Sequence, residues 1–312
     1  MEEIIIDLDV RPADRWNQLD SYGKEIDELL GYYLEDLGDV SFFTEAIEFY
    51  KQEYVPKEYL EEIAGVRKFC NFTENQILIT NLYYDALKFV FGCTSFSYLN
   101  HAENIHARNL DWWSERNALK AHSKVFHFKK ANEIIYSSVG WPGFIGILSG
   151  MRASSYSITL NAVLSSEGPN MAPPVTLLIR QVLEFEQDYD SAVRKLCQTP
   201  IASDCLLMIV GKEPGQACVI ERTPTKFAIR NPENNQLIVT NDYKILNGAN
   251  LSNDILQDTS CGRYDKVKEL LSKHPPQNEK DYFEILSNEG VKMNITVQQM
   301  VFNLTKNKII LK

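Results

Sequence analysis

The spacing of hydrophobic residues along the chain changes near residue 92. Before this point, apolar residues recur at every third or fourth position, which places them on one face of a helix. The spacing predicts a short strand at residues 4–8 and helices over residues 16–33, 42–50, 57–64 and 74–89. Thr73 and Gln76 form a capping-box pattern just ahead of the last of these helices.

After residue 93 the period becomes two, in short runs rich in β-branched and aromatic residues. We expect strands at residues 94–99, 105–109, 124–128, 134–138, 157–161, 206–210, 217–221, 226–230, 236–240, 295–302 and 308–311. Helices are expected at residues 175–186, 191–197 and 264–271. Because most strands follow one another through short links and the helices come in separate blocks, the pattern indicates an α+β fold with layered antiparallel sheets.

Composition then narrows the class of protein. The 312 residues are 44% hydrophobic and 24% charged, which is typical of globular enzymes. A net charge of -10 without a basic stripe argues against a nucleic-acid partner. The six cysteines show no CxxC spacing, and His101 and His106 alone are too few for a metal site. The glycine-rich residues 140–150 lack a nucleotide-binding pattern, so we expect neither metal nor cofactor.

The N-terminal residues are acidic and do not resemble a signal peptide, so the chain as it stands is expected to be cytoplasmic. A signal trimmed from the sequence would make the protein lysosomal or secreted, and four Asn-X-Ser/Thr sites are compatible with that alternative. Since no apolar run approaches the ~20 residues of a spanning helix, any membrane contact should be peripheral.

Candidate chemistry lies where the spacing changes. Residues 93–113 have the pattern of a hairpin, with Cys93 on its first strand and Arg108 and Asp111 on its second. Antiparallel pairing can bring these residues together, and an arginine stabilises a thiolate while a carboxylate orients an amine. However, a lone cysteine on an apolar strand is more often a structural thiol, and an Arg and Asp pair is more often on the surface. Spacing alone therefore leaves both interpretations open.

A family resemblance favours the catalytic interpretation. Cys93-Thr94-Ser95, followed by residues 105–111, resembles the start of the mature β-chain in the acid ceramidase and N-acylethanolamine acid amidase family. This family belongs to the cysteine N-terminal nucleophile hydrolases of the choloylglycine hydrolase superfamily. Further similar segments fall in the same order, at residues 6–9, 15–16, 78–85, 140–150, 209–211, 240–243 and 294–296.

The resemblance implies a four-layer αββα sandwich and a self-processing precursor. The bond between Gly92 and Cys93 would be cut, giving a helical α-segment of residues 1–92 and a catalytic β-segment of residues 93–312 that stay associated in one intertwined unit. The long helical leader separates this chain from bile salt hydrolases, in which the cysteine directly follows the initiator methionine.

The resemblance also assigns roles at the new N-terminus. Cys93 would be the nucleophile, with its own α-amine as the general base. Asp111 would hold this amine, and Arg108 would support the thiolate. Asn241 would donate to the oxyanion, with Asn161 as a weaker second candidate.

Further implied residues surround these groups. Arg263 would fix the oxyanion asparagine in place. Trp141 and Phe144 could line an acyl channel, although core packing explains them equally well. The relatives carry a glutamate where this chain has Ala162, which puts acid activation in doubt, although Glu167 lies close by in the sequence.

The expected reaction is hydrolysis of a fatty-acyl amide, N-acylethanolamine-like or ceramide-like, to a fatty acid and an amine. One alternative is another amide of the same superfamily, such as a bile salt, an acyl-homoserine lactone or a penicillin. Another is an uncleaved, non-catalytic lipid-binding homologue. Phe89 and Phe91, exposed by cleavage, motivate the hypothesis of contact with a membrane or micelle surface.

Overall fold

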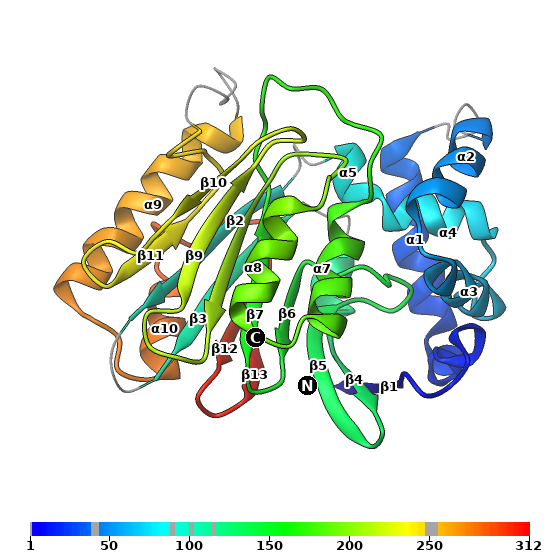
Figure 1. Ribbon diagram of the computed structural model, residues 1–312, viewed down its shortest axis with the longest axis horizontal. Helices are drawn as coiled ribbons and strands as arrows, with labels where there is room; N and C mark the ends of the chain where they lie inside the picture. The colour runs from blue at the N-terminus through cyan, green and yellow to red at the C-terminus, as the bar shows by residue number, and fades with distance from the viewer. Residues whose placement is uncertain (1, 39–43, 88–90, 100–102, 114–116, 247–254) are drawn as a thin grey trace.

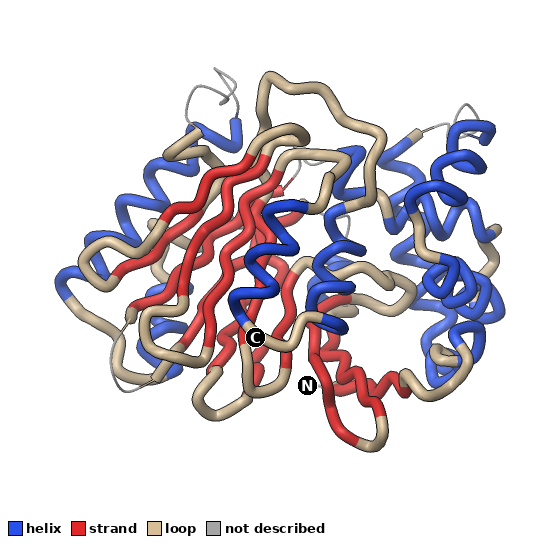
Figure 2. Tube along the Cα trace, viewed as in Figure 1, coloured by secondary structure: helices blue, strands red, loops and turns tan. Residues whose placement is uncertain are grey.

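The computed structural model describes residues 2–38, 44–87, 91–99, 103–113, 117–246 and 255–312. Two sheets lie face to face in the middle of the molecule, and helices cover their outer faces (Figures 1 and 2). Among the described residues, no helix is both long and apolar enough to cross a membrane.

The larger sheet has eight strands among the described residues, in the order β1-β4-β5-β6-β7-β8-β9-β10. Neighbouring strands are antiparallel except β1 and β4, which are parallel. The bounds are β1 Glu3–Asp7, β4 Lys124–Lys130, β5 Glu133–Gly140, β6 Ser149–Arg152, β7 Tyr156–Asn161, β8 Cys205–Gly211, β9 Ala217–Arg222 and β10 Phe227–Arg230.

The smaller sheet has five described strands, in the order β11-β2-β3-β12-β13, and is antiparallel throughout. Its bounds are β2 Phe91–Tyr98, β3 Ile105–Trp112, β11 Gln236–Val239, β12 Thr296–Asn303 and β13 Lys308–Leu311. The predicted hairpin of β2 and β3 thus occupies the centre of this sheet, where both faces are covered.

Helices complete the layers. α7 (Val175–Phe185) and α8 (Tyr189–Gln198) pack on the larger sheet, while α9 (Ile255–Lys273) and α10 (Glu279–Leu286) pack on the smaller one. The leader forms a separate helical group at one side, in blue and cyan in Figure 1. It comprises the 3-10 turns Pro12–Asp14, Asn17–Tyr22 and Arg67–Phe69 and the helices α1 Gly23–Leu37, α2 Thr44–Tyr54, α3 Lys57–Val66, α4 Glu74–Asn81 and α5 Tyr83–Leu87.

Two apolar clusters follow from the alternation of side chains along the strands. On β2, Cys93 belongs to the large core cluster that the two sheets share with the leader. Phe96 points to the other face and stacks on Tyr282 of α10, with ring centroids 5.6 Å apart. The predicted αββα sandwich is therefore confirmed, and Cys93 lies on its inner side.

Several boundaries differ from the sequence predictions. The first predicted helix begins only at Gly23, after a 3-10 turn, and the fourth breaks at Leu82 into α4 and α5. The capping box of Thr73 and Gln76 forms as expected. Residues 42–43 and 88–89, placed in predicted helices, lie outside the described residues.

Other elements have no counterpart in the predictions. β6 and α10 were not expected, nor was the short α6 (Ala118–Ala121). β6 is only four residues long and contains a glycine, so it lacks a readable alternation. The expectation that the sheets are wholly antiparallel is wrong at one edge, because β1 of the leader joins parallel to β4. A parallel neighbour can come only from a distant segment, which a local pattern does not reveal.

Candidate active site

Cys93 lies on β2, and its side chain points between the two sheets. The residue is only 1% exposed, so its thiol is enclosed by protein. The Sγ atom lies 3.9 Å from the carbonyl oxygen of Leu160, on β7 of the opposite sheet. Burial of this kind is also typical of an unreactive core thiol. Whether Cys93 can act as a nucleophile therefore depends on the groups around its sulfur.

The first such neighbour is Arg108. In the register of β2 and β3, Ser95 pairs with Arg108 and Cys93 pairs with Leu110, so the side chains of Cys93 and Arg108 share one face. The Arg108 guanidinium is fully buried, and its Nη2 donates to Cys93 Sγ at 3.2 Å. Its Nη1 donates to the Leu148 carbonyl and to Ser149 Oγ, both at 2.5 Å. A fixed positive charge therefore lies where a thiolate would form.

Asp111 lies on the other face of the same hairpin, directly opposite Gly92. Its Oδ1 accepts from Thr296 Oγ1 at 2.5 Å, and its Oδ2 is buried with no hydrogen-bond partner among the described residues. Burial raises the pKa of Asp111, although Arg263, with Nη1 4.0 Å from Oδ2, opposes this. The Oδ2 atom thus has a charged neighbour but no described hydrogen-bond donor, and a buried carboxylate oxygen in this state can accept a new donor.

Asn241 holds the backbone of Cys93. The pairing of Val239 with Ser95 carries the chain past β11 to the level of Cys93, where Asn241 Oδ1 accepts from the Cys93 N–H at 3.0 Å. The Nδ2 group donates to the Ala162 carbonyl at 2.8 Å. A side-chain amide carries two N–H donors, so this contact leaves one for another acceptor.

Arg263, on α9, braces the same point. Its Nη1 donates to the Cys93 carbonyl at 2.5 Å and to Thr94 Oγ1 at 2.9 Å. Its Nη2 donates to Asn241 Oδ1 at 2.7 Å, which fixes the orientation of that amide. Burial lowers the pKa of Arg263, and the negative charge of Asp111 counters the loss.

Asn161 lies on β7 with all of its amide contacts made. Nδ2 donates to the carbonyls of Val239 and Thr240, each at 3.1 Å, and Oδ1 accepts from Ser95 Oγ at 2.9 Å. Both N–H groups are engaged, so the geometry favours a brace for the segment before Asn241. Its role as an oxyanion donor stays a prediction.

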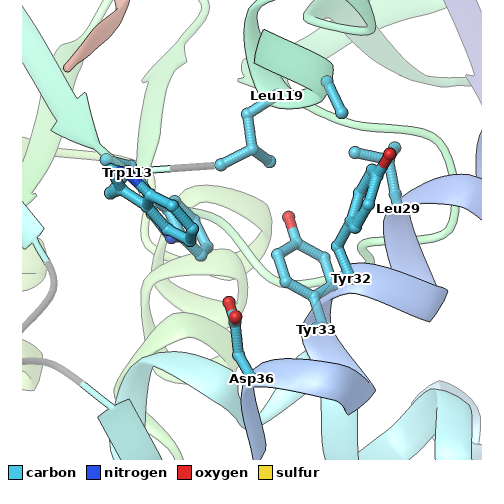
Figure 3. Close-up of a pocket in the computed structure, with 8 residues that line it drawn as sticks. Leu29, Tyr32, Tyr33, Asp36, Trp113 and Leu119 are labelled. Atoms are coloured by element: carbon cyan, nitrogen blue, oxygen red, sulfur yellow. The ribbon is translucent and has the colours of Figure 1, made fainter. Parts of the chain in front are cut away.

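Trp141 and Phe144 are 1% and 8% exposed, respectively. Trp141 packs edge-on against Trp112, with ring centroids 5.3 Å apart, and lies 6.1 Å from the ring of Phe144. Trp112 in turn borders a small cavity between α1 and the end of β3, shown in Figure 3. The cavity lining is Leu29, Tyr32, Tyr33, Asp36, Trp112, Trp113, Ala118 and Leu119.

This cavity has a volume of about 10 Å³, room for about one water molecule. Trp141 and Phe144 therefore pack behind its aromatic wall and do not line it. Their expected contact with substrate stays a prediction.

Comparison with known proteins places the chain in a family. Residues 99–300 match the family of acyl-coenzyme A:6-aminopenicillanic acid acyl-transferase, and this is more than half of the chain. The chain belongs to this acyl-transferase family. The matched residues begin just after Cys93 and include Arg108, Asp111, Asn241 and Arg263.

The similar individual proteins are named as amidases and ceramidases. An N-acylethanolamine-hydrolyzing acid amidase of Caenorhabditis elegans is 28% identical over 94% of this chain and 86% of its own length. An acid ceramidase of Balaenoptera acutorostrata scammoni is 24% identical over 70% of this chain and 62% of its own. A solved structure of a Caenorhabditis elegans N-acylethanolamine-hydrolyzing acid amidase ortholog is similar with a TM-score of 0.58 and 26% identity, covering 68% of this chain and 93% of that one.

The structure brings five of the predicted site residues of this chain into one cluster. Cys93 contacts Arg108, Asn241 and Arg263 directly, and Asp111 lies beside Gly92. Glu167, considered because of Ala162, instead binds Thr225 and Lys226 in the turn between β9 and β10.

Sequence reasoning missed the groups that hold this cluster. Thr296 binds Asp111, Ser149 binds Arg108, and Ser260 Oγ accepts from the Asn241 N–H at 2.8 Å. Hydroxyl groups of this kind are too common in a sequence to stand out. The resemblance at residues 294–296 was the one available signal for Thr296.

His106, set aside as a metal ligand, is a buried neighbour of the site. Its Nδ1 lies 2.9 Å from Ser157 Oγ and its Nε2 lies 3.0 Å from Thr159 Oγ1. Burial lowers the pKa of His106 to about 3, with a further contribution from Arg108, so the ring is neutral. In the described part of the chain, no group of three metal-ligating side chains could hold an ion.

Proposed function

We propose that this chain is a self-processing cysteine amidase that hydrolyses fatty-acyl amides to a fatty acid and an amine. The observation that carries the proposal is the arrangement around Cys93. Arg108 lies 3.2 Å from its sulfur, Asn241 holds its N–H, and Asp111, whose Oδ2 accepts no hydrogen bond from the described residues, is paired with Gly92 across the hairpin.

Self-processing begins with attack of Cys93 Sγ on the Gly92 carbonyl carbon. As the Gly92–Cys93 C–N bond breaks, the nitrogen takes a proton and becomes the α-amine, while the Gly92 acyl group is left on sulfur as a thioester. Water then attacks the thioester, releasing the Gly92 carboxylate and the free thiol. In this proposal the new ammonium donates to Asp111 Oδ2, which accepts no hydrogen bond from the described part of the intact chain.

Turnover repeats the same chemistry on a substrate. The α-amine of Cys93 accepts the thiol proton, because an α-amine has a pKa near ~7.7–8.0 and serves as a general base. The thiolate attacks the amide carbonyl carbon, the amine leaves with a proton, and water hydrolyses the acyl-enzyme. In this proposal the remaining N–H of Asn241 stabilises the oxyanion, and such a donor is typically worth ~2.7–4 kcal/mol.

A fatty-acyl amide, N-acylethanolamine-like or ceramide-like, is the favoured substrate, since the relatives are named for N-acylethanolamine and ceramide hydrolysis. The test is a panel of long-chain N-acylethanolamines, ceramide, a conjugated bile acid, an acyl-homoserine lactone and a penicillin. Release of fatty acid from the first two supports the proposal. Turnover of only one of the other three compounds would change the substrate assignment but would leave the proposed cysteine mechanism uncontradicted.

Cleavage itself is tested on a gel. Incubation of the purified protein at acidic and neutral pH should yield fragments 1–92 and 93–312, and Cys93→Ala should stay intact. Cys197→Ala is the matched control, because Cys197 is another buried thiol, on α8 outside the cluster. If the parent is never cleaved, or if Cys93→Ala is cleaved as fast as the parent, the chain is not self-processing. That result would support the alternative of a non-catalytic lipid-binding homologue.

Peripheral contact with a membrane or micelle remains a proposal from the sequence. Phe89 lies outside the described residues, and Phe91 begins β2 with no described side chain. Activity on vesicles that is unaffected by Phe89→Asp and Phe91→Asp would count against it.

A further inference from the structure

Arg108 depends on a segment that the hairpin does not contain. Both acceptors of its Nη1 come from the end of the 141–149 segment, between β5 and β6: the Leu148 carbonyl and Ser149 Oγ. The Leu148 carbonyl also accepts from the Leu160 N–H at 2.9 Å, which ties this point to β7. Nη2 of Arg108 also donates to the Leu160 carbonyl of β7. The guanidinium beside Cys93 is therefore held jointly by β7 and by this segment, called here the arginine loop (residues 141–149, the link after β5 with the first residue of β6).

Asn81, the last residue of α4 in the leader, holds the arginine loop by two contacts. Its Oδ1 accepts from the Ile145 N–H at 2.7 Å, and its Nδ2 donates to the Gly143 carbonyl at 3.1 Å. Nδ2 also donates to the Ile77 carbonyl at 2.9 Å, which fixes the side chain to its own helix. Asn81 is 1% exposed, so these contacts are shielded from water.

Gly143 shows how closely the leader and the arginine loop fit. Its φ is +85°, a conformation that other residues rarely adopt. A Cβ there would lie 3.0 Å from Cγ2 of Ile26, on α1 of the leader. The loop therefore bends sharply while pressed against the leader.

A buried ion pair adds a third link. Arg180 of α7 donates to the Ile145 carbonyl at 3.1 Å and forms a two-point pair with Glu62 of α3, at 2.6 and 2.7 Å. Both side chains are fully buried, and Glu62 also accepts from Trp16 Nε1 at 2.8 Å. Burial alone would raise the pKa of Glu62, but Arg180 lowers it overall, so the carboxylate is charged.

We propose that Asn81 and Glu62 of the leader are positioning residues for catalysis, because they hold the arginine loop and thereby place Arg108 beside Cys93. The leader is then a lasting part of the active site after cleavage and not only a segment to be removed. This inference rests on the proposed function, and it assigns the leader a role in turnover.

The test compares variants on the same two helices. Asn81→Ala removes both loop contacts, while Asn75→Ala, also on α4, removes only contacts to Glu48 and Lys51. Glu62→Gln removes the buried charge with little change of shape, and Glu61→Gln on α3 is its partly exposed control. Measured quantities are kcat and KM on a long-chain N-acylethanolamine, and the rate of Cys93 alkylation by iodoacetamide against pH, read from the mass of the Cys93 peptide.

The charged groups around the thiol are Arg108 and Arg263, with Asp111 across the strand. We expect Asn81→Ala and Glu62→Gln to lower kcat by about tenfold to a hundredfold, since a misplacement near 1 Å has this effect. KM should change little. The rate of Cys93 alkylation should fall, because the thiolate loses part of its contact with Arg108. The two control variants should match the parent.

A merely structural role would lower the melting temperature and leave kcat and the alkylation profile of the folded protein unchanged, and that result overturns the inference. If Asn81→Ala does not fold, the isosteric Glu62→Gln decides in its place. A parent without cleavage or turnover refutes the proposed function instead. The alkylation profiles of parent and variants still test the positioning role in that case.

Discussion

Gly92 offers a direct test of the cleavage geometry. A Cβ added at this residue would lie 2.8 Å from Met293 Sδ, 3.2 Å from Asp111 Cβ and 3.6 Å from Asp111 Oδ2. The thioether is flexible and half-buried, so it can move, whereas Asp111 is held by Thr296 and by the strand register. The added methyl group must therefore displace the Gly92 backbone, which carries the carbonyl that Cys93 would attack in the proposed self-cleavage.

The magnitude follows from these distances. Overpacking by one methyl group costs about 1–3 kcal/mol, and the mobile thioether places Gly92→Ala near the lower end. If about 1.4 kcal/mol of this opposes the attack, self-cleavage slows by about tenfold. Gly92→Val adds two further methyl groups against Asp111 and should block cleavage. In the double variant with Met293→Ala, Gly92→Ala should recover part of its rate.

Cleavage is followed by the appearance of fragment 93–312 on a gel over time after rapid mixing or during expression. Gly168→Ala is the matched control, because a Cβ there meets nothing within 4 Å. Equal cleavage rates for the parent, Gly92→Ala and Gly92→Val would refute the assignment of Gly92 as the tightly packed residue of the scissile bond.

Three further outcomes follow from the site and its support. In the intact chain burial raises the pKa of Asp111, so as the pH falls its carboxylate is protonated earlier than an ordinary one; self-cleavage should decline through that range, and Asp111→Asn should lack this acid limb in a profile of cleavage rate against pH. Asn241→Ala should lower kcat by a factor that corresponds to ~2.7–4 kcal/mol, and a loss confined to KM would contradict oxyanion stabilisation. In a Cys93→Ala background, which keeps the chain in one piece, Arg180→Met should lower the free energy of unfolding by about 3 kcal/mol, the lower end for breaking a buried pair, because Glu62 loses Arg180 but keeps Arg15 at 2.9 Å. The pair Glu62→Met with Arg180→Met should cost less than the sum of the two, as measured in urea.

The sequence predicted the parts of the site that depend on the local pattern of apolar and polar residues. The hairpin of β2 and β3 follows from two alternating runs, and its register places Arg108 on the face of Cys93. The layers of the fold follow from the change of period near residue 92. The helical leader was predicted in the same way, although the break at Leu82 was not, because apolar spacing continues across it.

The rest depends on contacts between distant segments. Asn241 and Arg263 lie 148 and 170 residues from Cys93, and only the family resemblance singled them out. The acceptors of Arg108 include backbone carbonyls, which every residue possesses, so no residue type marks them. Asn81 had no signal beyond its place within a similar helical segment, since its partners are main-chain groups of the arginine loop.

The pleat of β2 explains why one hairpin can supply both charges. Arg108 reaches the sulfur of Cys93 from the side between the sheets, whereas Asp111 lies on the side of α9, opposite Gly92. A thiol and a carboxylate on opposite faces cannot interact through side chains alone. The backbone nitrogen of Cys93 lies in the plane of the sheet, between the two faces, so after cleavage it can accept the thiol proton from one side and bind Asp111 on the other. An N-terminal amine at this residue would therefore join two half-sites that the strand otherwise separates, and this supports the proposal that the cut falls at Gly92–Cys93.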